Sequence, residues 1–283
     1  MKVGLLLEGG ALRGIFSAGV MDVLLDNSII IDGIIGVSAG ALFGPNYFSK
    51  QKGRVLRYNS KYINDKRYIS IRNLLLTGNM ISKNFAFYKM NNQLDRFDNE
   101  TFKKENKEFI AVATNVKTAK AEYFQIKDPL KDMEILRASS AMPAVSKMVK
   151  INNNKYLDGG IADSIPIEKM LSLNYDKIII ILTQPINYQK QSINNNRFKY
   201  IKFKYRHYPE LIKVMENRYS VYNEKISKIK DLEKQGKVFV IRPKEKINIE
   251  ILKCDKNDIK RVYDMGVEEA KKSIKKLKNY LAK

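Results

Sequence analysis

IDGIIGVSAGALF, residues 31–43, has the order of a buried strand, a tight turn and a helix. The apolar run before Ser38 predicts a strand that is buried on both faces, and the run after it begins a helix. Gly36 and Gly40 flank the serine, as in the Gly-x-Ser-x-Gly turn that lifts a nucleophilic hydroxyl above the end of a sheet. This short pattern also occurs by chance, so the rest of the chain has to supply the context.

Strands and helices alternate along the 283 residues. Residues 3–7 form a continuous apolar run that ends in the turn EGG, and apolar residues then recur at helical spacing from Leu12 to Leu24. Further strands are expected at 108–116, 121–126, 155–160, 177–182 and 237–243, and further helices at 132–141, 166–173 and 256–281. This alternation predicts an α/β fold with a mostly parallel central sheet flanked by helices.

Two stretches look like additions to that core. Residues 50–105 are polar and mainly helical in tendency, and we expect a cap over one end of the sheet. Residues 187–236 are the most basic part, and RFKYIKFKYR (197–206) alternates cations with aromatic rings. This segment is either a membrane-surface contact or an edge strand or amphipathic helix whose rings pack inward.

The charge balance is strongly positive, with 52 Lys and Arg against 30 Asp and Glu and a formal net charge of +22. Such a charge favours anionic partners, either nucleic acid or acidic phospholipids, although abundant Lys, Asn and Ile also fit a biased genome composition. Cys254 and His207 are the only cysteine and histidine, which excludes an internal disulfide and a Cys/His zinc site. Without an apolar run of about 20 residues or a secretion signal, we expect a soluble cytoplasmic protein.

The loop EGGALRG (8–14) lies between the first strand and the first helix, where free backbone N–H groups can bind an anion. Its glycine spacing does not fit a dinucleotide fingerprint, and no Gly-Lys-Ser/Thr follows for a P-loop. The remaining candidate for the bound anion is the oxyanion of an acyl-transfer intermediate. Alternatively, the glycines bind no anion and only allow the turn to pack closely against its neighbours. Because two turns at one sheet edge lie side by side, we expect Ser38 beside the N–H groups of Gly10 and Ala11.

Two residues compete for the role of the base. His207 follows Ser38 and Asp158 in α/β-hydrolase order, but Ser38 comes after only the second strand and the cations around His207 disfavour an imidazolium. Asp158 in YLDGG stands at a strand end, where a partly desolvated carboxylate can accept the serine proton directly. The alternative for Asp158 is a carboxylate that stabilises a turn.

The motifs EGGALRG, GVSAG and DGG, in this order, resemble those of the patatin-like phospholipase family over about residues 1–185. The resemblance implies a three-layer α/β fold, a Ser38–Asp158 dyad and a lipid ester substrate, with no metal or cofactor. It also implies that the glycine-rich loop forms the oxyanion hole and binds substrate. Glu8 replaces the leading Asp and Ala11 the third glycine of the family loop.

The resemblance assigns the remaining site residues by position. Arg13 matches the family's basic residue, which holds the loop or a substrate phosphate. The motif glycines are Gly9, Gly10, Gly14, Gly36, Gly40, Gly159 and Gly160. We expect residues 1–185 to be the catalytic core and residues 186–283 to complete it and contact an anionic membrane, with nucleic acid an unfavoured partner.

Two other functions compete with that of a phospholipase A or lysophospholipase that works through an acyl-enzyme on Ser38. One is a His207-dependent α/β-hydrolase that acts on soluble esters. The other is a basic protein that binds membrane or nucleic acid with idle hydrolase motifs.

Overall fold

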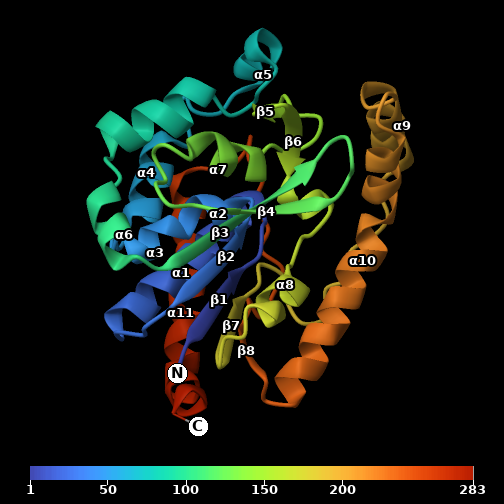
Figure 1. The fold of residues 1–283 in the computed structure, drawn as a ribbon. Coiled ribbons are helices and arrows are strands. Elements are labelled where there is room, and N and C mark those ends of the chain that lie inside the picture. Colours follow the sequence, from blue (N-terminus) through green and yellow to red (C-terminus); the bar gives the residue numbers. More distant parts are fainter. Residues whose placement is uncertain (283) are drawn as a thin grey trace.

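The central sheet is mixed and mostly parallel (Figure 1). The computed structural model describes residues 1–282, and within them eight strands form one sheet in the order β5-β6-β3-β2-β1-β7-β8, with β4 paired to β3. The strands β3, β2, β1, β7 and β8 are parallel, whereas β4, β5 and β6 run antiparallel to their neighbours. The bounds are β1 Val3–Leu7, β2 Gly33–Val37, β3 Glu108–Asn115, β4 Ala121–Gln125, β5 Val149–Ile151, β6 Asn154–Asp158, β7 Lys177–Ile181 and β8 Val238–Ile241.

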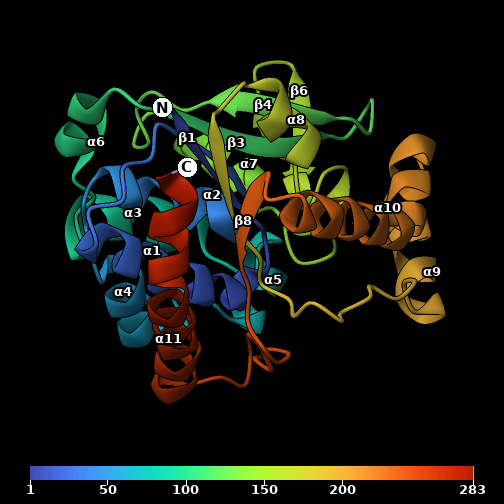
Figure 2. The same cartoon turned by 90° about the horizontal axis from the view of Figure 1, so that it is seen from below.

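Helices cover both faces of the sheet and give three layers (Figures 1 and 2). Along β1, Leu5 and Leu7 pack into one apolar cluster and Leu6 into another on the opposite face, because successive strand side chains alternate. Helices α1 (Gly14–Asp26), α4 (Arg54–Tyr62) and α11 (Lys256–Leu281) contribute to the first cluster. Helices α8 (Ile167–Ser172) and α10 (Pro209–Lys234) contribute to the second.

The strands predicted from apolar runs are confirmed to within about two residues, except that the three-residue strand β5 was missed. Residues 50–105 are mainly helical, and their α4 packs beside α1, while Tyr58, Phe85 and Met90 join the first cluster. Segment 197–206 lies mostly in a helix, α9.

The remaining bounds are η1 Ala11–Arg13, α2 Ala39–Phe43, α3 Pro45–Phe48, α5 Ile71–Thr77, the π-helix η2 Lys83–Leu94, α6 Asn99–Glu105, α7 Met133–Ser139, η3 Gly159–Ile161 and α9 Asn195–Lys204.

The last quarter of the chain belongs to the same sheet and core. Strand β8 pairs in parallel with β7, and α11 lies against α1, where the Tyr263 hydroxyl donates to Asp22 at 2.6 Å. Throughout residues 1–282, every helix is too short or too polar to span a bilayer.

Candidate active site

Strand β3 brings the ends of two other strands together. Its residues 110–112 pair with both β2 and β4, and its residues 113–114 pair with both β4 and β6. Since a strand has two edges, β2 and β6 must share the edge opposite β4. Strand β2 ends opposite Val112 and β6 ends opposite Ala113, so the two strands meet head to head. Ser38, just after β2, therefore lies beside Asp158, the last residue of β6.

Ser38 has a backbone conformation that ordinary residues rarely adopt, with φ 55° and ψ −116°. Side chains at both flanking positions would clash: a Cβ on Gly36 would lie 2.6 Å from the Gly40 backbone, and one on Gly40 would lie 2.6 Å from the Leu7 carbonyl oxygen. The Ser38 N–H donates to the hydroxyl of buried Ser139 at 3.0 Å. The two motif glycines thus allow the strained turn, and the strain orients the serine hydroxyl.

The Ser38 hydroxyl donates to Asp158 Oδ2 at 2.6 Å, and Asp158 Oδ1 accepts from the Gly160 N–H at 2.7 Å. Asp158 is only 6% exposed. Burial raises the pKa of this carboxyl above its usual value, although the bonds from Ser38 and Gly160 and the charge of Arg218 oppose the rise. A raised pKa makes the carboxylate a stronger base than an exposed aspartate, which suits proton abstraction from a hydroxyl.

The glycine-rich loop is held by its leading acid. Glu8 accepts from the Thr183 N–H at 2.6 Å through one oxygen and from the Tyr222 hydroxyl at 2.8 Å through the other. Gly9 packs on Ser38, since a Cβ there would lie 2.9 Å from that of the serine. Among residues 1–282, the N–H groups of Gly10 and Ala11 have no hydrogen-bond acceptor. Two free donors therefore stand close to the serine, which is what an oxyanion hole requires.

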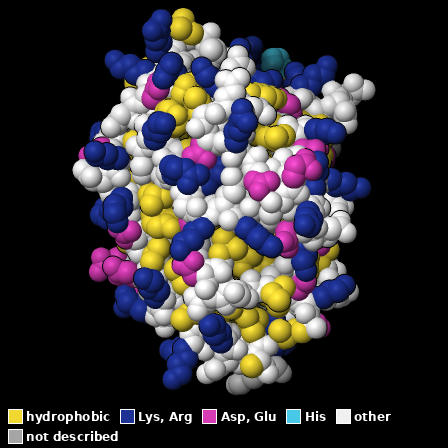
Figure 3. Space-filling model, turned by 90° about the vertical axis from the view of Figure 1, so that its left-hand side faces the viewer, with side chains coloured by type: hydrophobic (Ala, Val, Ile, Leu, Met, Phe, Trp, Pro, Cys, Tyr) yellow, Lys and Arg dark blue, Asp and Glu magenta, His cyan; other side chains and the backbone are white. Residues whose placement is uncertain are grey.

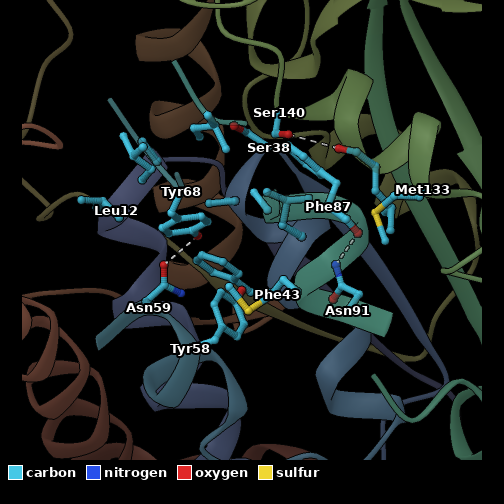
Figure 4. A pocket seen from close by; sticks show the side chains of 18 of the residues that line it. Leu12, Ser38, Phe43, Tyr58, Asn59, Tyr68, Phe87, Asn91, Met133 and Ser140 are labelled. Atoms are coloured by element: carbon cyan, nitrogen blue, oxygen red, sulfur yellow. Dashed lines mark hydrogen bonds between the residues drawn. The ribbon is translucent and has the colours of Figure 1, made fainter. Parts of the chain in front are cut away.

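Ser38 lies at the junction of two cavities. The first is mainly apolar and extends below the serine among aromatic and aliphatic side chains of residues 54–97, α2 and α7 (Figure 4). Its lining includes Leu12, Phe43, Tyr58, Tyr68, Phe87, Met90, Met133 and Leu136. The second is polar and contains the loop 8–11, Asp158 and three cations. Ala11, Ser38 and Met142 line both cavities, so a bound molecule could pass from one to the other across the serine.

Some predicted site residues have other surroundings. Gly14 lines neither cavity and instead allows α1 to approach α2, because a Cβ there would lie 2.6 Å from that of Ala39. Gly159 likewise packs on the Val112 carbonyl of β3. Arg13 lines the polar cavity, and its buried Nε has no hydrogen-bond partner among the described residues. His207 is exposed and lines neither cavity.

Three residues of the polar cavity were not predicted. Lys190, Arg218 and Tyr222 come from the basic stretch 187–236, and the last two lie four residues apart on one face of α10. No motif marks them among the 52 Lys and Arg residues and 16 tyrosines of the chain. Within residues 1–282, no three His, Cys, Asp or Glu side chains gather closely enough to hold a metal ion.

A family model described as patatin-like phospholipase matches residues 5–171, more than half of the chain. The chain belongs to this family. A second model, described as a domain of unknown function (DUF6363), matches residues 208–282. The patatin-like match contains the glycine-rich loop, Ser38 and Asp158, whereas the second match contains Arg218 and Tyr222.

Similar proteins include "Uncharacterized protein YjjU" of Escherichia coli, which is 28% identical over 65% of this chain and 52% of that protein, so the match spans about half its length. "Probable lipid hydrolase 463L" of Invertebrate iridescent virus 6 is 29% identical over 67% of this chain and 72% of that one. "Lysophospholipase NTE1" of Coccidioides immitis is 27% identical over 64% of this chain and 11% of that one. Among solved structures, VipD from Legionella pneumophila aligns with a TM-score of 0.46 at 13% identity, over 96% of this chain and 66% of that one.

Proposed function

We propose that this patatin-like protein is a serine-dependent lipid acyl hydrolase of the phospholipase A or lysophospholipase type. The observation that carries the proposal is the 2.6 Å hydrogen bond from Ser38 to the buried carboxylate of Asp158, at the junction of an apolar and a polar cavity. Relatives named as a lipid hydrolase and a lysophospholipase support the substrate class.

The proposed reaction has two steps. The ester carbonyl oxygen accepts hydrogen bonds from Gly10 and Ala11 while Ser38 attacks the carbonyl carbon and its proton passes to Asp158. Asp158 then protonates the departing alcohol, which leaves an acyl-enzyme on Ser38. Water attacks the acyl carbon, gives one proton to Asp158 and releases the fatty acid, and that proton returns to Ser38. The apolar cavity, with its aromatic and methionine lining, would hold the acyl chain.

The first test is fatty-acid release from mixed phosphatidylglycerol and phosphatidylcholine vesicles. The wild type should release fatty acid, and Ser38→Ala should reduce the rate by more than about 10³-fold because the acyl-enzyme cannot form. Ser172→Ala is the matched control, since this exposed hydroxyl donates to the Lys169 carbonyl of its own helix. Equal release from the wild type and Ser38→Ala would refute the assignment of the nucleophile.

We further propose that the protein is cytoplasmic and contacts an anionic membrane through α5 and α9. Both helices lie at the top of Figure 1, the end toward which the parallel strands run. Their exposed apolar residues include Leu75 at 80%, Leu76 at 71% and Phe203 at 70% exposure. Lys202 and Lys204 accompany Phe203 on α9, a mixture that suits a lipid interface. Figure 3 shows Lys and Arg side chains dispersed over one face of the molecule.

Co-sedimentation with vesicles tests this contact. Phe203→Ser and Leu75→Ser should each weaken binding to vesicles that contain phosphatidylglycerol, and added salt should weaken it further. Ile30→Ser is the control, because Ile30 is 71% exposed but precedes β2 at the opposite end of the sheet. If Ile30→Ser reduces binding as much as Phe203→Ser does, the contact is not specific to this end.

We also propose that residues 1–185 are the catalytic core and that residues 186–283 complete it. Three contacts support a single functional unit: β8 on β7, α11 on α1, and the Tyr222 hydroxyl on Glu8. Limited proteolysis of the wild type should therefore release no active fragment that ends before α10.

A further inference from the structure

The polar cavity beside Ser38 gathers three cations from separate parts of the chain. Arg13 lies in η1, Lys190 follows β7, and Arg218 projects from α10. Their charges interact, because burial, Arg218 and Arg13 all depress the pKa of Lys190, to about 8, while Glu8 opposes the shift. Such a grouping of like charges is unfavourable unless something else compensates it.

The two carboxylates of the cavity do not provide that compensation through direct ion pairs. Glu8 accepts from the neutral donors Thr183 and Tyr222, and Asp158 accepts from Ser38 and Gly160. Neither carboxylate forms a salt bridge with a described residue. The two carboxylates accept hydrogen bonds from neutral groups and attract Arg218 only at longer range.

Donors on the cations remain available. Arg218 uses Nε on the Gly160 carbonyl and Nη2 on the Ser164 hydroxyl at 3.3 Å, which leaves Nη1 without a partner among the described residues. Lys190 Nζ has no hydrogen-bond acceptor within residues 1–282 and lies 4.4 Å from the centre of the Tyr222 ring. The buried Nε of Arg13 is unpaired as well. These free donors can bind an anion that has several acceptor oxygens, and a phosphate group is such an anion.

We propose that Lys190 and Arg218, with Arg13, bind the phosphate of a lysophospholipid or phospholipid headgroup and thereby select phosphate-bearing lipids over neutral esters. This inference rests on the proposed function. Because Ser38 lines both cavities, an ester bound there extends its acyl chain into the apolar cavity and its glycerol phosphate into the polar one. Two parts of the polar cavity, Arg218 and Tyr222, come from the segment matched only by the model of unknown function. That segment then supplies one of the three cations that determine headgroup specificity.

Lys190 gives the cleanest test, because its ammonium group donates no hydrogen bond to a described residue and contacts only the face of the Tyr222 ring. The rate constant kcat/KM is measured for lysophosphatidylglycerol and for monoacylglycerol with the same acyl chain, at fixed detergent concentration. Lys190→Met should lower the ratio of the two kcat/KM values about 10- to 100-fold, the usual effect of losing one charged hydrogen bond. The loss should lie mainly in KM, and Lys190→Arg should restore most of it. Lys213→Met on the exposed surface of α10 is the charge-matched control.

Two results of this comparison of substrates would overturn the proposal. An equal loss on both substrates would mean that Lys190 only supports the fold of the site, and an unchanged ratio would mean that it does not contact phosphate. A third arm adds inorganic phosphate to the lysophosphatidylglycerol and monoacylglycerol assays. Competitive inhibition of lysophosphatidylglycerol alone is expected, whereas a strong change in monoacylglycerol hydrolysis that Lys190→Met removes would indicate a free-phosphate regulator instead of a headgroup site.

A binding measurement separates this proposal from the proposed function. In the Ser38→Ala background, calorimetry compares the affinity for lysophosphatidylglycerol with that for monoacylglycerol, and no turnover is required. Tighter binding of the phosphate-bearing lipid that Lys190→Met abolishes supports the cavity assignment even if hydrolysis is absent. Ser38-dependent hydrolysis of monoacylglycerol without any such preference would preserve the proposed function and refute the headgroup site.

Discussion

Asp158→Asn should make the protein inactive and more stable at the same time. Burial is the largest influence on the pKa of Asp158 and raises it, so the folded state favours the neutral carboxyl more than water does. At neutral pH the ionised side chain therefore destabilises the fold, by about 1.4 kcal/mol for each unit of the rise. Asparagine keeps an oxygen for the Gly160 N–H and an amide beside Ser38, but it carries no charge and accepts no proton.

The pH dependence has a definite sign. Below the usual pKa of 3.8, the wild-type carboxyl is neutral whether the chain is folded or unfolded, and the two proteins should have similar stability. As pH rises from 3.8 through the raised pKa, the wild type loses stability relative to Asp158→Asn, and the difference then stays constant. Each increment of about 1.4 kcal/mol in that difference corresponds to a Tm higher by about 3 °C for a protein of this size.

Urea unfolding of both proteins between pH 4 and pH 8, together with fatty-acid release at pH 8, tests the two halves of this prediction. Loss of the base should reduce kcat by about 10²- to 10⁴-fold. Lower stability of Asp158→Asn at pH 8, or activity within tenfold of the wild type, would show that the buried carboxylate does not serve as the base in this way.

Three further changes test the surroundings of the site. Gly36→Ala places a Cβ 2.6 Å from the Gly40 backbone and should cost about 1–3 kcal/mol, measured by urea unfolding; no loss would show that the turn is not tightly packed. Tyr222→Phe removes the bond to Glu8 and should cost about 1.5–3 kcal/mol and lower kcat; unchanged kcat and stability would contradict a role in holding the loop. Ala11→Gly relieves a left-handed φ of 49° and should raise Tm by up to about 2 °C without loss of activity, as thermal unfolding can check.

The parallel sheet was predictable because its strands are buried on both faces and read as unbroken apolar runs. Strand β5 escaped because three residues, VKI, carry no period that distinguishes a strand from a loop. The order of the motifs predicted that Ser38 and Asp158 lie together. The physical cause is that β2 and β6 share one edge of β3, and this depends on a strand-pairing register that cannot be read from the sequence.

The polar cavity could not be predicted for a related reason. Arg218 and Tyr222 reach it because α10 packs on one face of the sheet, and the backbone of Lys190 is hydrogen-bonded to Asn223 of that helix. Long-range packing of this kind leaves no local pattern in the sequence. Segment 197–206 illustrates the same limit, since Ile201 and Tyr205 are buried whereas Phe203 and Tyr200 are exposed, a division that the alternation of cations and rings does not predict.

The bond between Glu8 and Tyr222 has a consequence for the timing of biosynthesis. A ribosome translates the loop and the serine turn early, long before it reaches α10. A nascent chain tethered near a membrane would therefore display Ser38 while Glu8 lacks its tyrosine partner and Arg218 has not yet been made. The proposed lipolysis would begin only when the last third of the polypeptide has emerged and docked.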